Sequence, residues 1–260
     1  MNEEKIPFSP EGYRKIIEYG LEKGYKFISF KDFEKNKHQE KICILRHDID
    51  LSLDLAFEMA KIESEYHING TYFVLLFDDL YNPFSHEGQK IIRKISDLGY
   101  EIGFHWNPLD YINSENPYHD FKKHLELLQS IAGESVKSVS NHLPTINGNI
   151  KIRLPPEGFI NAYDSLFFNS GSFTYVSDSS MRWRQYIPID LMKDGRGVHF
   201  LVHPIWWMIE GNKLKEKIKN LTEKNSAKIK ESLNGFFLEI DNALSRRKEL
   251  DELYLKNRSK

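Results

Sequence analysis

Short runs rich in β-branched and aromatic residues alternate with longer amphipathic segments along most of the chain. The short runs, typical of buried strands, are LEKGYKFISF, KICILRH, GTYFVLLF, GYEIGFH, VKSVSNH, FTYVSD and VHFLVHP. Between the second and third runs, segment 52–66 has apolar residues at three- and four-residue spacing, which predicts a helix with Ser52 as its N-cap. Similar helices are predicted to close at Gly99 and Gly133, where a left-handed C-cap is favoured. Strands that alternate with crossover helices predict a parallel α/β sheet.

The pattern changes after Glu210, where the chain becomes strongly charged. Apolar residues at helical spacing predict a long amphipathic helical tail, which we expect to form two helices. An α/β barrel of about 200–250 residues is an ordinary single domain. We therefore expect one barrel domain over residues 1–210, with residues 211–260 as a helical extension packed on it. The apolar stripe of this extension could instead pack on a second copy of the chain and give a homo-oligomer.

Composition excludes several classes of protein. Lys and Arg total 36 against 38 for Asp and Glu, so the overall charge does not favour a nucleic-acid partner. The single cysteine, Cys43, excludes disulfides within the chain and a cysteine-based zinc site. The longest apolar stretch, 71–77, is far shorter than the roughly 20 residues of a membrane span, and the N-terminus lacks the apolar region of a signal peptide. We therefore expect a cytoplasmic protein. The phosphate-loop motifs of organic cofactors are also missing.

Ionisable residues gather where the predicted strands end. They are Arg46, His47, Asp48, Asp50, Glu101, His105, His142, Asp178 and His203. The carboxyl ends of strands in a parallel barrel face one mouth, so these side chains should converge there. Residues two apart on a strand point to the same side, which lets Asp48 and Asp50 address one point. Two close carboxylates favour a divalent cation between them, although either aspartate could instead cap the following helix.

The order of several motifs resembles a known family. RHDID, GTYFVLL, LGYEIGFHWN, SNHLP, YVSDSSMRW and FLVHPIWW follow one another over residues 40–210. This series resembles the polysaccharide deacetylase family, carbohydrate esterase family 4, and especially a divergent branch with an Arg-His-Asp-x-Asp motif. The resemblance implies an α/β fold of the deacetylase type, a distorted and incomplete seven-stranded (β/α) barrel. It also implies a divalent metal, with zinc expected and cobalt or manganese as alternatives.

The resemblance assigns the metal-binding residues by position. Asp48 matches the family's catalytic base, Asp50 its metal-binding aspartate and His105 the first histidine of its metal motif. The second histidine of that motif would stand at position 109, where this chain has Leu109. His142 is our candidate for the missing ligand, because it follows a strand where the family has an arginine before a proline. Arg153 is the competing match for that arginine.

The later motifs supply candidates for proton transfer and for substrate contact. His203 resembles the catalytic acid, and an imidazole can donate a proton near neutral pH; His199 is its rival on the same strand. Asp178 resembles an aspartate that orients catalytic groups, although a plain turn residue would also fit SDSS. The candidate substrate-binding residues are Trp106, Trp183, Trp206 and Arg46, and the loop-rich segment 141–171 should form an irregular wall over the site.

These roles predict a metal-dependent carbohydrate deacetylase, a hydrolase that removes an acyl group, with acetyl expected, from an N- or O-acylated sugar or glycan precursor. Leu109 favours a different class, an inactive deacetylase-like protein that binds sugar or acts as a scaffold in polysaccharide biosynthesis. A third alternative is a metal-dependent barrel hydrolase acting on phosphoesters or cyclic amides, which Arg46 and Arg153 leave open.

Overall fold

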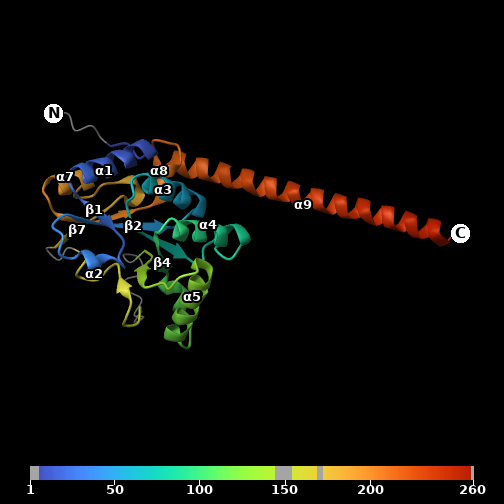
Figure 1. Cartoon of the computed structure of the whole chain (residues 1–260), viewed down its shortest axis with the longest axis horizontal. Coiled ribbons are helices and arrows are strands. Elements are labelled where there is room, and N and C mark those ends of the chain that lie inside the picture. Colours follow the sequence, from blue (N-terminus) through green and yellow to red (C-terminus); the bar gives the residue numbers. More distant parts are fainter. Residues whose placement is uncertain (1–5, 144–153, 169–171, 259–260) are drawn as a thin grey trace. The chain divides into compact units, whose positions relative to one another are not determined.

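A parallel sheet forms the centre of the fold (Figure 1). The structure, a computed structural model, describes residues 6–143, 154–168 and 172–258. Its strands are β1 (Lys26–Ile28), β2 (Ile42–Ile49), β3 (Thr71–Leu75), β4 (Glu101–Trp106), β5 (Ser138–Asn141), β6 (Ile160–Asn161), β7 (Phe173–Ser177) and β8 (Gly197–Val202). Seven of them are hydrogen-bonded in the order β6-β5-β4-β3-β2-β8-β7, and β1 pairs with β2. Among the described residues no pairing joins β6 to β7, so the sheet curls into the incomplete barrel that was predicted.

Strand β2 lies at the middle of this sheet and has three neighbours. On one side β1 pairs with residues 42–44 and β3 with residues 46–49. On the other side β8 pairs with residues 43–47. Every residue of β2 is buried, as expected for a strand that is covered on both faces of a parallel sheet. Cys43 lies within it and is fully buried.

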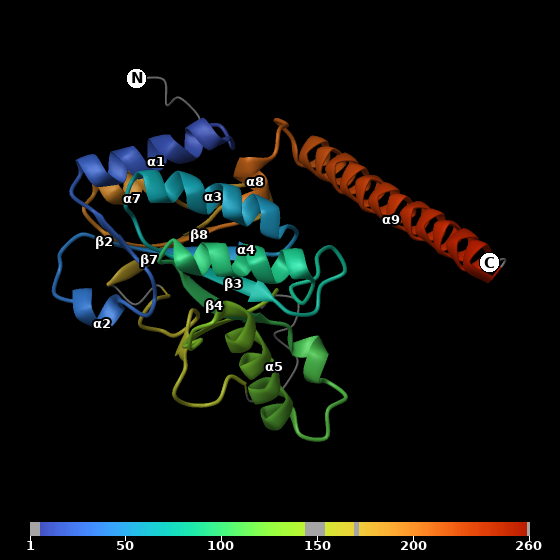
Figure 2. The ribbon, with the colours of Figure 1, turned by 45° about the vertical axis from the view of Figure 1, so that its right-hand side comes forward.

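Helices connect the strands. They are α1 (Pro10–Glu22), α2 (Phe33–Asn36), α3 (Leu53–Glu65), α4 (His86–Asp97), α5 (Pro117–Ala132), α7 (Pro188–Lys193) and α8 (Pro204–Met208), with short 3₁₀ turns η1 (Pro108–Tyr111) and η2 (Ser179–Met181). Figure 2 shows α1, α3 and α4 side by side over one face of the sheet. The predicted caps are confirmed: Ser52 accepts a hydrogen bond from the Leu55 amide, and Gly99 and Gly133 have φ of 95° and 74°.

A buried polar cluster ties α1, α3 and β3 to the outer face of β2. His47 Nε2 lies 2.6 Å from Glu63 Oε1, and its Nδ1 lies 3.1 Å from the Thr71 carbonyl oxygen. The hydroxyls of Tyr13 and Tyr72 donate to the same Glu63 carboxylate over 2.5 and 2.9 Å. His47 therefore points away from Asp48 and bonds within the barrel wall.

The C-terminal extension is one helix, α9 (Leu214–Arg258), of 45 residues. The expectation of two helices was wrong, because the Asn and Gly residues of the tail do not interrupt it. Residues 1–214 and 215–260 form two separate compact units. None of the helices in the described part of the chain is long and apolar enough to cross a membrane.

Candidate metal centre and catalytic cavity

A cavity of about 410 Å³ opens where the central strands end. Asp48 reaches it from β2, Asp50 from the residue after β2, His105 from β4, His142 from the residue after β5, and His203 from the residue after β8. Between the two aspartates, Ile49 turns into the hydrophobic core and is 1% exposed. The strand alternation and the convergence of strand ends expected from the sequence thus place five predicted residues around one space.

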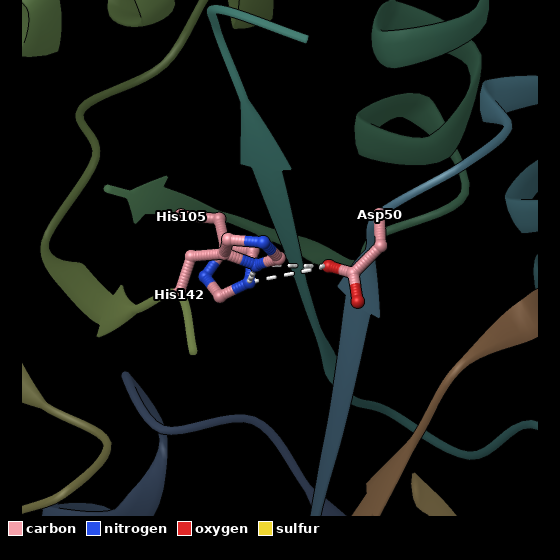
Figure 3. Close-up of side chains that lie close together, drawn as sticks. All are labelled: Asp50, His105 and His142. Carbon is pink, nitrogen blue, oxygen red and sulfur yellow. Dashed lines mark hydrogen bonds and ion pairs between the residues drawn. The ribbon is translucent and has the colours of Figure 1, made fainter. Parts of the chain in front are cut away.

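Asp50, His105 and His142 point toward one another the atoms with which they could bind a metal (Figure 3). His105 Nε2 and His142 Nδ1 lie 3.3 and 3.5 Å from Asp50 Oδ1, and the two nitrogens are 3.1 Å apart. Burial opposes ionisation of Asp50, but the three nearby imidazoles of His105, His142 and His203 outweigh it and hold its pKa well below the ordinary value.

The donor set fits a divalent cation. His105 Nδ1 donates to the backbone carbonyl of Ser140 over 3.0 Å, which fixes the tautomer and leaves the Nε2 lone pair facing Asp50. Asp50 Oδ1 is buried and lacks a hydrogen-bond partner among the described residues. Ligands about 2.0–2.1 Å from a tetrahedral ion lie about 3.3 Å from one another, close to the separations found here. One carboxylate and two imidazoles also match the preference of zinc and similar metals.

Asp48 is held by an arginine below the cavity floor. Arg46 is fully buried, and its Nε and Nη2 donate to the two Asp48 oxygens over 2.9 and 2.8 Å. Nη2 also contacts the hydroxyls of Ser140 and Tyr163 at 2.5 and 3.0 Å. Burial would raise the pKa of Asp48, but the charge of Arg46 outweighs it and lowers the pKa below its ordinary value. The carboxylate is therefore fixed in orientation and kept ionised.

His203 faces the same cavity from the other side of Asp50. Its Nδ1 lies 2.6 Å from Asp178 Oδ1, and its backbone amide and Trp207 Nε1 both donate to Asp178 Oδ2, over 2.9 and 2.7 Å. Its Nε2 points to Asp50 Oδ2 at 3.6 Å. Burial disfavours the charged ring, but Asp178 and then Asp50 outweigh it and raise the pKa of His203 to about 9.

Side chains from later segments form the remaining wall. They include Leu143, Tyr163, Phe168, Tyr175, Arg184, Gln185 and Tyr186. Tyr163 and Phe168 belong to the predicted irregular wall of residues 141–171, so its described part does lie over the site. The sequence did not single out any of these aromatic residues, because tyrosine and phenylalanine are also the ordinary content of a core.

Several predicted substrate contacts lie away from the cavity wall. Trp106 is 4% exposed and packs on Tyr111 and Phe121. Trp183 stacks on Phe8 at 5.3 Å beside a different, open hollow. Trp206 is 9% exposed, with its ring 6.5 Å from that of His203. None of the three is among the residues that the structure places around the cavity.

Arg46 likewise does not line the cavity, since it lies beneath Asp48 and is fully buried. The sequence could have indicated that Arg46 lies next to Asp48, because residues two apart along an extended strand point to the same side. Leu109 is 52% exposed in η1 and also lies outside the lining, so the place of the family's second histidine does not face the cavity. Arg153, the competing match for His142, falls outside the described residues.

His199, the rival of His203, lies below the cavity. Its side chain is fully buried, and its Nδ1 donates to the Phe167 carbonyl over 3.1 Å. Burial, together with the charge of Arg46, lowers the pKa of His199 to about 3. A ring that stays neutral and does not reach the cavity cannot deliver a proton to a substrate there.

The sequence matches no protein-family model and no curated protein. Among solved structures, it is similar to a Streptococcus pyogenes deacetylase in complex with acetate, with 15% identity over 50% of this chain and 61% of that chain and a TM-score of 0.40. A polysaccharide deacetylase from Bacillus cereus has 15% identity over 70% and 87% of the two chains, with a TM-score of 0.42. A pseudoenzyme of the same esterase family from Bacillus anthracis has 13% identity over 72% and 62%, with a TM-score of 0.37.

The chain thus spans less than two thirds of the streptococcal deacetylase and of the pseudoenzyme. Similarities of this size say nothing about activity, and the three structures include both a deacetylase and a pseudoenzyme. The similar solved structures also include a family 4 carbohydrate esterase from Bacillus anthracis, with 15% identity over 80% and 85% of the two chains and a TM-score of 0.39.

Proposed function

We propose that this chain is a metal-dependent hydrolase that removes an acyl group, with acetyl expected, from an N- or O-acylated sugar or glycan precursor. The observation that carries the proposal is the convergence of Asp50 Oδ1, His105 Nε2 and His142 Nδ1 in a cavity that also contains a fixed carboxylate and a carboxylate-bound imidazole. A binding protein would have no need of that pair of proton-transfer groups beside a ligand set.

Asp50, His105 and His142 would hold the metal, for which zinc is expected and cobalt or manganese would also suit the ligands. When bound, a divalent ion would polarise the acyl carbonyl and lower the pKa of an attacking water to about 7. The second nitrogen of His105 is bonded to the Ser140 carbonyl, so this ring is already oriented as a ligand.

Asp48 is the proposed base. Arg46 holds both of its oxygens, which sets the direction of the carboxylate and leaves it ionised and ready to accept the proton of the attacking water. Because the carboxylate cannot rotate away from this bidentate contact, the water must approach it from the cavity side.

His203 is the proposed acid. The proton on its Nδ1 is hydrogen-bonded to Asp178. The proton that the charged ring can give to a leaving group is therefore the one on Nε2, which faces the cavity. The raised pKa of His203 keeps that proton in place near neutral pH until the leaving amine or alcohol takes it. Asp178 is therefore a positioning residue for His203.

The cavity wall suits a sugar ring. Tyr163, Phe168, Tyr175 and Tyr186 offer aromatic faces, and Arg184 and Gln185 offer hydrogen-bond donors at the rim. Trp106, Trp183 and Trp206 are not needed for this recognition.

The alternative of an inactive sugar-binding scaffold depended on Leu109. Since Leu109 does not face the cavity and His142 does, the departure from the family's motif need not remove a ligand. The sugar-binding scaffold would be the better interpretation if the protein proves unable to bind a divalent metal.

That test measures divalent metal content by elemental analysis of protein purified without chelator, together with acetate release from N-acetylglucosamine oligomers. About one ion per chain is expected in the wild type, with almost none in Asp50→Ala and His142→Ala, because each removes one of three ligands. Asp48→Asn should retain the metal but lose acetate release. His119→Ala, an exposed histidine on α5, is the matched control and should change neither.

A wild type that contains no metal and takes up neither zinc, cobalt nor manganese would overturn the hydrolase mechanism in favour of a binding protein. Metal bound equally by the wild type and both ligand variants would place the ion elsewhere. A cytoplasmic location and association with other copies of the chain remain predictions.

A further inference from the structure

Helix α9 exposes an unusual number of large apolar side chains. Ile229, Leu233, Phe236, Phe237, Ile240, Leu244 and Leu250 are each between 39% and 66% exposed. Single apolar residues on a surface are ordinary, but this many on one helix indicates a surface that is covered in the functional state.

Most of these residues follow a heptad pattern. Alternating steps of four and three residues connect Ile229, Leu233, Phe236, Ile240, Ala243, Arg247 and Leu250. Such steps keep successive side chains on one seam of the helix, the arrangement of the a and d positions in a coiled coil. Arg247 is the one charged residue in the seam.

The helix also has a local weakness inside this segment. Gly235 lies in the helix interior with open space around its missing Cβ, and glycine there costs roughly 0.5–1 kcal/mol relative to alanine. A helix gains most of its stability from packing of its apolar face, so this part of α9 has reason to pack against a partner.

We propose that α9 pairs with α9 of a second copy of this chain as an antiparallel two-stranded coiled coil. Charge complementarity between flanking residues identifies a second copy of α9 as the partner. The residues that flank the seam on one side are Glu239 and Arg246, seven positions apart, and those that flank it on the other are Phe237 and Leu244.

In an antiparallel pair, flanking positions of the same kind face each other across the seam. One register places Glu239 opposite Arg246 of the partner subunit, and it does so twice because the pair is symmetric. The same register places Phe237 opposite Leu244 of the partner subunit, so the second flank extends the apolar surface.

The seam residues agree with that register. Leu233 then faces Leu250 of the partner subunit, and Ile240 faces Ala243 of the partner subunit, so a large residue meets a small one. Phe236 faces Arg247 of the partner subunit, where the guanidinium can stack on the ring. Arg247 is thereby given an aromatic partner in the seam.

A parallel pair fits the same residues less well. It would bring two Arg247 side chains together in the seam and would place Glu239 beside Leu244 of the partner subunit. The antiparallel register therefore satisfies more of the charges than the parallel one.

The first experiment measures the mass of the full chain in solution by sedimentation or light scattering. We expect a dimer that Ile240→Asp converts to monomer. Leu238→Asp is the matched control, because Leu238 is 64% exposed on the same helix but lies off the seam, and it should leave the dimer intact. A monomeric wild type, or a dimer that Ile240→Asp does not weaken, would overturn the proposal. A monomer that binds anionic lipid vesicles through this stripe would overturn it as well.

The register is tested by charge exchange at low salt. Glu239→Arg and Arg246→Glu should each weaken the dimer at least several-fold, and the double variant should restore it. In a parallel dimer, Arg246→Glu would bring a carboxylate to Asp251 of the partner subunit, and the double variant would not recover. Failure of rescue thus overturns the antiparallel register.

The orientation has an independent test. Cys43 is fully buried, so the cysteines introduced by Leu233→Cys and Leu250→Cys are the thiols that can form a disulfide between subunits. When the two variants are mixed and oxidised, a disulfide should join one variant to the other and not either to itself. Crosslinking of each variant to itself would instead establish a parallel pair. Metal content and acyl hydrolysis are measured separately, so failure here leaves the proposed function untouched.

Discussion

Two histidine–carboxylate pairs in the barrel have the same 2.6 Å contact but different surroundings. His47 meets Glu63 in the wall, where both histidine nitrogens are engaged and two tyrosines saturate the carboxylate. His203 meets Asp178 with one nitrogen and turns the other to the cavity. The pairs differ in access, since the first is sealed and the second borders a space that a substrate can enter.

This difference shows that a histidine–carboxylate pair can have either a structural role or a role in proton transfer. A pair whose every polar atom has a partner inside the protein can only hold elements together. A pair with one nitrogen directed at a cavity can exchange a proton with whatever enters it. Each variant below acts on one pair and leaves the other as its internal control.

The largest effect is expected for His203→Ala. Loss of a general acid typically lowers turnover by about 10²–10⁴-fold, and kcat for acetate release should fall in that range. Metal content should stay close to wild type. A decrease of less than threefold would show that His203 is not the acid.

Glu63→Leu comes next and should act on stability. It leaves His47, Tyr13 and Tyr72 without their buried partner, and breaking such a cluster costs about 3–5 kcal/mol, measurable by urea unfolding. Glu63→Gln should cost much less, because the amide oxygen can still accept from Tyr72 while its nitrogen donates to His47 and to the Tyr13 hydroxyl oxygen. Loss of kcat without loss of stability would contradict the structural role of this pair.

Asp178→Asn should give the smallest effect and sharpen the comparison through pH. Asp178 raises the pKa of His203, so the protonated acid persists until the pH rises through about 9. Without that charge the pKa falls, and activity should be lost at lower pH, with about a tenfold deficit near pH 8. A pH–rate profile with an unchanged alkaline limit would exclude this positioning role.

The fold was largely predictable from the sequence. Strand runs, Ser52, Gly99 and Gly133 lay where the pattern indicated, because local propensity and capping agree with the tertiary structure there. The tail was harder to predict. The apolar residues of the tail suggested two helices, yet α9 is continuous from Leu214 to Arg258 and runs through Asn234 and Gly235, since isolated weak helix formers do not stop a helix of this length.

The floor of the site was also predictable, and its walls were not. Asp48, Asp50, His105, His142 and His203 were found because strand ends converge in a parallel barrel. The tryptophans were misplaced because sequence alone does not show which way an aromatic residue points at the end of a strand, in a short helix or in a loop. Trp207 shows this, since its ring is fully buried while its Nε1 supports Asp178.

The central place of β2 has a consequence for how this protein can change over evolution. Neighbours on both sides restrain this strand, so it can open only when much of the sheet unfolds. Arg46 and Asp48 lie on it and Asp50 follows it, whereas Tyr163, Phe168 and Arg184 lie in connecting segments. For the proposed hydrolase, selection can therefore exchange the segments that line the cavity while Asp48 and Asp50 remain anchored, so new specificities can arise at little cost to the proposed chemistry.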